Sequence, residues 1–152
     1  MYLMNTKKQT PNKMPINLLI VDDSELDIEI ARKAFSHCEN SSVSVFTACD
    51  GEAALEFLTD TKNPRAHMIL LDINMPKKSG IEVLEEIKGN KDLKDIPVVM
   101  LTGSGHEDDV RASYKHYANA FITKPESFSE MVDFAHRIEE FWFLAAKLPQ
   151  EE

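Results

Sequence analysis

Short apolar runs recur along the chain, and segments of helical periodicity separate them. The runs cover 16–21 (INLLIV), 43–48 (VSVFTA), 68–72 (MILLD), 96–101 (IPVVML) and 120–122 (AFI). The first and third are nearly uninterrupted, as expected of a strand buried on both faces of a parallel sheet. The runs therefore predict five strands, and no other feature restricts the fold as strongly.

Apolar residues at helical spacing lie between these runs, and some of the segments open with a helix-start signal. Ser24 is a candidate N-cap, and Asp27 follows three residues later, as in a capping box. The acidic residues 107–109 suit the positively polarised first turn of another helix. Further apolar faces contain Ala54, Leu55 and Leu58, and then Val83, Leu84 and Ile87. Five strands that alternate with five helices imply an α/β fold with right-handed βαβ crossovers and helices on both faces of the sheet.

A length of 152 residues is typical of one domain with a single core. We expect a flexible N-terminal extension over 1–14, a globular domain with an extended C-terminal helix over 15–148, and a tail over 149–152. The tail is too short for a separate effector domain, which predicts that the protein acts by docking to partners, as an adaptor or as a member of a phosphorelay.

Charge and composition exclude several function classes. The net charge is −9, and the basic clusters are no larger than short pairs such as 7–8 and 77–78, so we expect no nucleic-acid partner. No apolar run approaches the roughly 20 residues that span a bilayer, and the polar N-terminus lacks the apolar stretch of a signal peptide. Cys38 and Cys49 form no CxxC motif and are expected to be reduced thiols. A cytoplasmic protein without a membrane partner is the expectation.

Polar residues of complementary chemistry follow four of the predicted strands. They are Asp22 and Asp23, then Asp72, Thr102 and Lys124. Parallel α/β sheets gather such residues at the carboxyl edge of the strands, where ligands bind. Clustered carboxylates repel one another, and a hard cation such as Mg²⁺ relieves that repulsion. No GxxxxGK loop and no HExxH motif is present, so neither a nucleotide-hydrolysing P-loop nor a zinc protease site is indicated.

Four motifs, VDDSELD, LLDINMPKKSG, VVMLTGSG and FITKP, together resemble the receiver domains of two-component response regulators. The resemblance extends from about residue 16 to about residue 140. It implies a flavodoxin-like (βα)5 fold with strand order 2-1-3-4-5. It also implies that Asp72 accepts a phosphoryl group from a histidine kinase, and that the protein promotes only its own phosphorylation and dephosphorylation.

The same resemblance implies a metal site and its neighbours. Asp23, Asp72 and the main-chain carbonyl of Asn74 would bind Mg²⁺ directly, and Asp22 would hold a metal-bound water. The side chains of Asn74 and Ser104 match the positions that tune dephosphorylation in the family. Both side chains are small, so we expect a phosphorylated state of ordinary lifetime.

Further roles concern the phosphorylated state. The resemblance implies that Thr102 hydrogen-bonds the phosphoryl oxygen, that Lys124 pairs with it, and that Phe121 rotates as the switch aromatic. The alternative for Phe121 is a permanent core position. The family also implies a cis peptide between Lys124 and Pro125, which X-Pro bonds make accessible.

Two other functions remain alternatives. Phosphatases of the haloacid-dehalogenase type also use an aspartate nucleophile and Mg²⁺, but they need a second acid where this chain has Asn74. A phosphorylation-independent pseudo-receiver would be favoured if Asp23, Asp72 or Lys124 were missing, and all three are present.

The end of the chain, IEEFWFLAAKLP, resembles the small receivers that partner bacterial phytochrome-type histidine kinases, and this implies such a kinase as partner. One apolar stripe, expected to pack on the sheet, comprises Met131, Ala135, Ile138, Trp142 and Ala145. A neighbouring stripe comprises Phe134, Phe141, Leu144 and Leu148, with Phe143 further round. This surplus of apolar surface favours a homodimer through the last helix, and a terminus folded back on the domain is the alternative.

Overall fold

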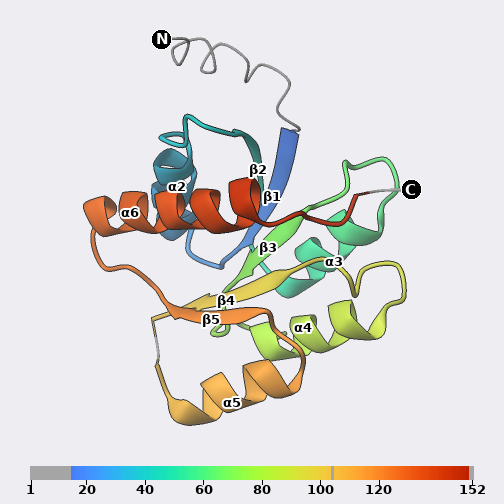
Figure 1. Ribbon diagram of the computed structural model, residues 1–152. Helices are drawn as coiled ribbons and strands as arrows, with labels where there is room; N and C mark the ends of the chain where they lie inside the picture. The colour runs from blue at the N-terminus through green and yellow to red at the C-terminus, as the bar shows by residue number, and fades with distance from the viewer. Residues whose placement is uncertain (1–14, 104, 151–152) are drawn as a thin grey trace, which may run out of the picture.

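A five-stranded parallel sheet forms the centre of the computed structural model, which describes residues 15–103 and 105–150 (Figure 1). The strands are β1 (Pro15–Val21), β2 (Ser42–Ala48), β3 (Met68–Leu71), β4 (Val98–Thr102) and β5 (Ala120–Thr123). Their order in the sheet is β2-β1-β3-β4-β5, and all neighbouring pairs are parallel. The expected (βα)5 fold and strand order are therefore confirmed.

Helices cover both faces of this sheet. They are α2 (Glu25–Phe35), α3 (Gly51–Thr59), α4 (Gly80–Gly89), α5 (Glu107–Lys115) and α6 (Phe128–Ile138), and a π-helical segment η2 (Glu139–Ala145) continues α6. Helices α2 and α6 lie on one face, and α3, α4 and α5 lie on the other (Figure 1). Among the described residues, no helix is both long and apolar enough to cross a bilayer.

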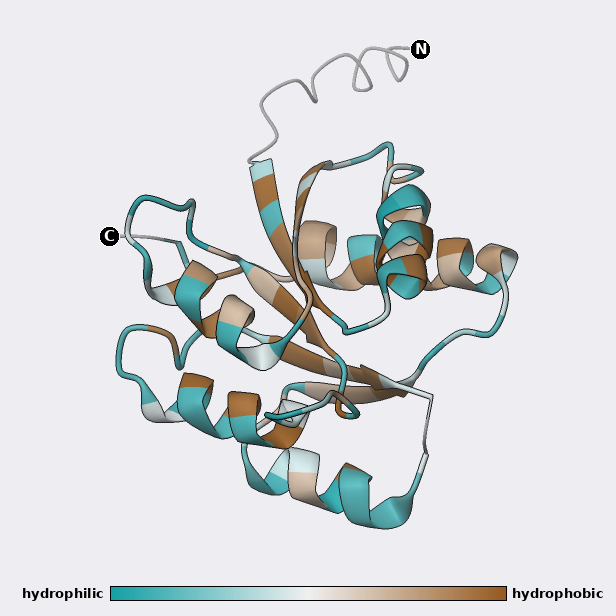
Figure 2. Ribbon diagram, turned by 180° about the vertical axis from the view of Figure 1, so that it is seen from behind, coloured by the Kyte–Doolittle hydropathy of each residue, from teal (hydrophilic) through white to brown (hydrophobic). Residues whose placement is uncertain are grey.

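Strand β1 shows how one apolar run supplies two cores. Leu18 and Ile20 pack on α2 and α6, whereas Leu19 and Val21 pack on α3 and α4, because successive side chains of a strand point to opposite faces. In Figure 2 the strands are accordingly mostly brown, whereas the helices carry teal bands between brown ones. This double burial holds the strands rigidly and so positions the residues that follow them.

Helix starts agree with the sequence in one respect and differ in another. The Ser24 hydroxyl caps α2 by accepting from the backbone N–H of Asp27 at 3.2 Å. The Asp27 carboxylate, however, accepts a hydrogen bond from Lys124 at 3.0 Å, so the expected capping box is not its role. A complete capping box occurs instead at α4, between Ser79 and Glu82.

The fourth strand begins two residues later than predicted. Ile96 and Pro97 precede it, because the Ile96 N–H donates to the Leu93 carbonyl in a turn at 3.0 Å and proline has no N–H to donate. Ile96 is nevertheless buried, so its apolar side chain serves the core from outside the strand.

The end of the last helix departs from the predicted α-helical faces. The backbone N–H of Ala146 donates to Phe141, five residues back, and this wider turn changes the direction of the side chains. Phe143 therefore packs against Phe35, with ring centroids 6.5 Å apart, although α-helical spacing puts it further round the helix than both apolar stripes. Ala145, predicted on the buried stripe, is exposed. Met131, Ala135 and Ile138 are buried as expected.

Buried Glu139 marks the point where α6 becomes η2. Its carboxylate accepts hydrogen bonds from the Asn40 N–H at 3.0 Å and the Ser41 hydroxyl at 2.7 Å, so it joins the segment before β2 to the C-terminal helix. Nearby Cys38 and the more distant Cys49 are free thiols, and burial raises the pKa of Cys38 to about 12. The expected extension over 1–14 lies outside the described residues.

Candidate functional site

Backbone hydrogen bonds carry the sheet one residue beyond its strands and place the polar residues that follow. The Asp22 N–H donates to Ala48 at 3.1 Å, and the Asp72 N–H donates to Val21 at 3.0 Å. The Lys124 N–H donates to the Thr102 carbonyl at 2.7 Å. The predicted residues therefore converge at the carboxyl edge, as the topology requires.

Three carboxylates form a cluster at this edge. One oxygen each of Asp22, Asp23 and Asp72 lie within 4.8 Å of one another. Asp22 and Asp72 are each 6% exposed, whereas Asp23 is exposed to solvent. An all-oxygen donor set with one open side fits a hard divalent cation, which keeps some of its water ligands. The residues present therefore suit the magnesium ion that the sequence predicts.

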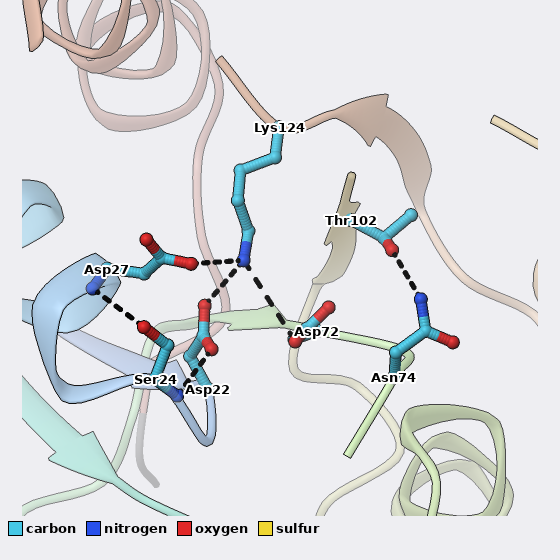
Figure 3. Close-up of polar contacts among 7 residues, drawn as sticks. All are labelled: Asp22, Ser24, Asp27, Asp72, Asn74, Thr102 and Lys124. Carbon is cyan, nitrogen blue, oxygen red and sulfur yellow. Dashed lines mark hydrogen bonds and ion pairs between the residues drawn. The ribbon is translucent and has the colours of Figure 1, made fainter. Parts of the chain in front are cut away.

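Lys124 supplies the positive charge of the site. Its Nζ donates to Asp22 at 2.8 Å and to Asp27 at 3.0 Å, and lies 4.0 Å from the Asp72 carboxylate (Figure 3). The peptide between Lys124 and Pro125 is trans, so the predicted cis bond is wrong. The long lysine side chain reaches the carboxylates without it, and trans is favoured by about 0.5–1 kcal/mol in X-Pro bonds.

Asp27 is a site residue that the sequence reasoning missed. It lies on the first turn of α2, so it follows no strand and was interpreted as part of a helix cap. The signal that could have revealed it is its spacing. It follows the N-cap Ser24 by three residues, so the first turn of α2 brings it back toward the edge that holds the strand-end carboxylates.

Burial and neighbouring charges change the acidity of the central groups. Burial raises the pKa of Asp72 to about 6, and the charges of Asp22 and Asp23 add to this, while Lys124 and the backbone N–H of Asn74 oppose it. For Lys124, burial alone would lower the pKa, but its hydrogen bonds to Asp22 and Asp27 and the charge of Asp72 outweigh that effect and raise it. Lys124 therefore carries its charge at neutral pH.

The remaining predicted residues flank the carboxylates. Thr102 is fully buried, and its hydroxyl accepts from the Asn74 side-chain amide at 3.3 Å (Figure 3). Phe121 is partly buried against the core, and its backbone N–H donates to the Tyr114 hydroxyl at 3.1 Å. Ser104 lies outside the described residues.

Gly80 brings the loop after β3 tightly against Asp72. A Cβ atom at this position would lie 2.1 Å from the carbonyl oxygen of Asp72 and 2.7 Å from Cα of Ile73. The Gly80 N–H also donates to the Ile73 carbonyl at 2.9 Å. Only glycine allows this approach, so the loop and the first turn of α4 hold the backbone of Asp72 from behind.

The geometry combines a carboxylate of raised pKa, a donor set for a divalent cation, an ammonium and a buried hydroxyl. A carboxylate can act as a covalent nucleophile, and the cations can neutralise a phosphoryl group bound to it. The hydroxyl of Thr102 can donate to an oxygen of that group. The site is therefore suited to accept and hold one phosphoryl group on Asp72.

Comparison with known proteins agrees with this chemistry. A family model described as the response regulator receiver domain matches residues 18–136. Response regulator Rcp1 of Synechocystis sp. is 40% identical over 141 residues, which cover 89% of this chain and 94% of Rcp1. The crystal structure of the Mn²⁺-bound form of Rcp1 has a TM-score of 0.78 and covers 90% of this chain and 100% of its own. The phosphorylated cyanobacterial phytochrome response regulator RcpA has a TM-score of 0.84 at 38% identity, with the same shares of both chains.

The matched region contains the strand-end carboxylates, Thr102, Lys124, the second half of β1 and the other four strands. The family model covers most of the chain, and Rcp1 is 40% identical over nearly its full length. The match to the Rcp1 crystal structure agrees with both. The chain belongs to the response regulator receiver domain family.

Proposed function

We propose that this protein is a response regulator that accepts a phosphoryl group from a histidine kinase on Asp72 and signals by a change of conformation. The observation that carries the proposal is the arrangement at the sheet edge. Asp72 lies within 4.8 Å of Asp22 and Asp23 and 4.0 Å from Lys124. RcpA, a similar protein, is known in a phosphorylated form.

Transfer requires one bond to form and one to break. An Asp72 carboxylate oxygen attacks the phosphorus of a phosphohistidine, and the phosphorus–nitrogen bond breaks as the imidazole leaves. Asp23, Asp72 and the Asn74 carbonyl would hold Mg²⁺, with Asp22 acting through a water, and the ion would neutralise the phosphoryl oxygens. Rcp1 binds Mn²⁺ in its crystal. Lys124 would pair with a phosphoryl oxygen, which requires its Nζ to move closer to Asp72.

The signal would start at Thr102. Its hydroxyl would turn to the phosphoryl oxygen, and Phe121 would rotate into the space left behind. Asn74 and Ser104 would leave room for the water that later hydrolyses the aspartyl phosphate. The protein would thus promote its own phosphorylation and dephosphorylation without turning over another substrate.

Acetyl phosphate with Mg²⁺ tests the acceptor. Intact-mass spectrometry should show one added phosphoryl group, absent from Asp72→Asn and unchanged in Asp92→Asn, a control at an exposed carboxylate. Labelling of Asp72→Asn at the wild-type level would refute the assignment. No labelling of the wild type would favour a phosphorylation-independent module, and continuous release of phosphate would favour a phosphatase.

The kinase partner is proposed to be of the phytochrome type, because RcpA is a phytochrome response regulator. Such a kinase would place the protein in the cytoplasm. Phosphotransfer profiling against all histidine kinases of the source genome is the test. Fastest transfer from a kinase without a phytochrome sensory region would contradict this choice.

Exposed apolar side chains on η2 support a homodimer. Phe141 is 60% exposed and Leu144 is 49% exposed, whereas Trp142 and Phe143 of the same segment pack on the core. Light scattering should show a dimer that Phe141→Glu with Leu144→Glu converts to a monomer. Leu26→Glu, a control at an apolar residue that is 70% exposed, should leave the mass unchanged. Equal masses for all variants would contradict a dimer through η2.

A further inference from the structure

Lys124 has one more carboxylate partner than the proposed phosphoryl chemistry needs. Its Nζ donates to Asp22, which follows β1, and to Asp27, which lies on α2. Asp72, the proposed acceptor, is farther away at 4.0 Å. In this structure Lys124 is thus bonded to two carboxylates that receive no phosphoryl group.

Asp27 lies on the far side of the lysine from the acceptor. Figure 3 shows the Lys124 Nζ between the Asp27 carboxylate on one side and Asp72 on the other. The first turn of α2 holds Asp27, since its N–H donates to the capping hydroxyl of Ser24 at 3.2 Å. The Ser24 N–H in turn donates to Asp22 at 2.9 Å. The Asp27 carboxylate therefore attracts the Lys124 ammonium away from Asp72.

The hydrogen bonds of Lys124 change if its Nζ, which lies 4.0 Å from the Asp72 carboxylate, moves to a phosphoryl oxygen there. An ammonium has three N–H donors, and Asp22 and Asp27 accept from two of them here. A divalent cation would compete with Lys124 for Asp22. Asp27 does not belong to the expected metal donor set, so it would stay hydrogen-bonded to Lys124 when the metal is bound and no phosphoryl group is present. Its side chain is 36% exposed, which makes the ion pair weak enough to break.

We propose that Asp27 is a resting-state latch that competes with the phosphoryl group on Asp72 for the Lys124 ammonium. The latch rests on the proposed function of Asp72, and it acts only through Lys124. Its consequence is that the phosphorylated arrangement is less populated than the other site residues alone would allow, because part of the binding energy is used to detach Lys124 from Asp27.

Beryllofluoride with Mg²⁺, a non-transferable mimic of the phosphoryl group, measures this competition. Fluorine NMR reports the bound mimic and gives its affinity for the full chain. Asp27→Asn should bind it about three- to tenfold tighter, as expected for the loss of one competing ion pair of partial exposure. Glu25→Gln is the matched control, because Glu25 is an exposed carboxylate on the same turn. It should change the affinity by less than about twofold, the size of a screened surface charge effect.

A double-mutant cycle separates the latch from a general charge effect. In the Lys124→Ala background, Asp27→Asn should give no more than the change seen for Glu25→Gln, because the residue through which Asp27 acts is gone. A gain that persists without Lys124, or an equal gain in Glu25→Gln, would overturn the latch. Weaker binding by Asp27→Asn would also overturn it, since Asp27 would then guide Lys124 rather than restrain it.

The failure of the latch and the failure of the proposed function give different results. If the wild type binds beryllofluoride and Asp72→Asn does not, the acceptor assignment stands, and an unchanged affinity in Asp27→Asn refutes the latch alone. If the wild type does not bind the mimic, the acceptor assignment fails, and the latch fails with it.

Discussion

An ion pair lies at each end of the sheet, and the two pairs differ in burial and in charge balance. At the carboxyl end, Lys124 pairs with Asp22 at 2.8 Å, and the two side chains are only 16% and 8% exposed. At the amino end, before β3 and β4, Arg65 pairs with Asp95 at 2.7 Å, and these side chains are 20% and 55% exposed. The distances are nearly equal, so environment and not geometry distinguishes the two pairs.

The carboxyl end also holds an excess of negative charge. Lys124 faces the carboxylates of Asp22, Asp27 and Asp72, whereas Arg65 and Asp95 form a balanced pair. Burial makes an unbalanced cluster costly, and an exposed pair contributes little in either direction. The comparison indicates that the site end is destabilised until a cation balances its carboxylates.

Removal of the acceptor carboxylate should have the largest effect. Asp72→Asn should increase the free energy of unfolding by about 3 kcal/mol at pH 7 without divalent metal, from the rise of the Asp72 pKa to about 6 from 3.8. Urea unfolding of both chains measures the difference. If the variant were less stable than the wild type at pH 7, the carboxylate cluster would not destabilise the fold as proposed.

The pH dependence checks the cause. Because the pKa of Asp72 is higher in the folded chain, its protonated form stabilises the fold, fully below about pH 3.8 and progressively less as the pH rises through about 6. The amide side chain of the Asp72→Asn variant cannot titrate, so the advantage of this variant should be small at about pH 4 and should grow toward pH 7. A difference that does not vary with pH would point to a packing effect.

Bound Mg²⁺ should remove much of the difference in free energy of unfolding between the wild type and Asp72→Asn. A ligand at about one hundred times its dissociation constant stabilises the fold that binds it by about 2.7 kcal/mol. Thermal unfolding of the wild type should therefore shift upward with Mg²⁺ and return with a chelator, and Asp72→Asn should shift much less. Equal shifts in both chains would show that Asp72 is not a ligand.

Gly80 and Gly89, the first and last residues of α4, allow the crowding of the backbone to be compared between the two ends of this helix. Gly80→Ala at the carboxyl end of the sheet should destabilise the fold by about 2 kcal/mol, because its Cβ would meet the Asp72 carbonyl oxygen. At the other end of the helix, an added Cβ on Gly89 meets no atom within 4 Å, so Gly89→Ala should stabilise by about 0.5 kcal/mol. Urea unfolding compares them, and equal effects would contradict the close contact behind Asp72.

An effect as small as that of Gly89→Ala is expected at the pair of Arg65 and Asp95. Asp95→Asn removes one charge from it while Arg65 keeps its hydrogen bond to the Asp92 carbonyl at 3.0 Å. The free energy of unfolding should fall by about 0.5 kcal/mol, and added salt should reduce the difference. A loss above about 2 kcal/mol would be as large as that expected for a buried pair, so burial would not explain the difference between the two ends.

Most of the fold and of the candidate site could be predicted from the sequence, because they depend on local patterns. The apolar runs identified the strands, and the residue after each run identified Asp22, Asp72 and Thr102 as neighbours. Parallel strands bring their carboxyl ends together whatever the details of packing. Family motifs added the strand order, which the spacing of the runs does not contain.

Only the tertiary structure decided how Lys124 is held and how the chain ends. Asp27 belongs to a helix, and its contact with Lys124 across 97 residues depends on how α2 packs on the sheet next to α6. The π-helical turn that brings Phe143 against Phe35 begins at Glu139, whose carboxylate bonds to the distant segment before β2. The sequence by itself determined periodicity and strand ends, which are local properties. Long-range contacts were decided by packing, because they are chosen by the free energy of the whole fold.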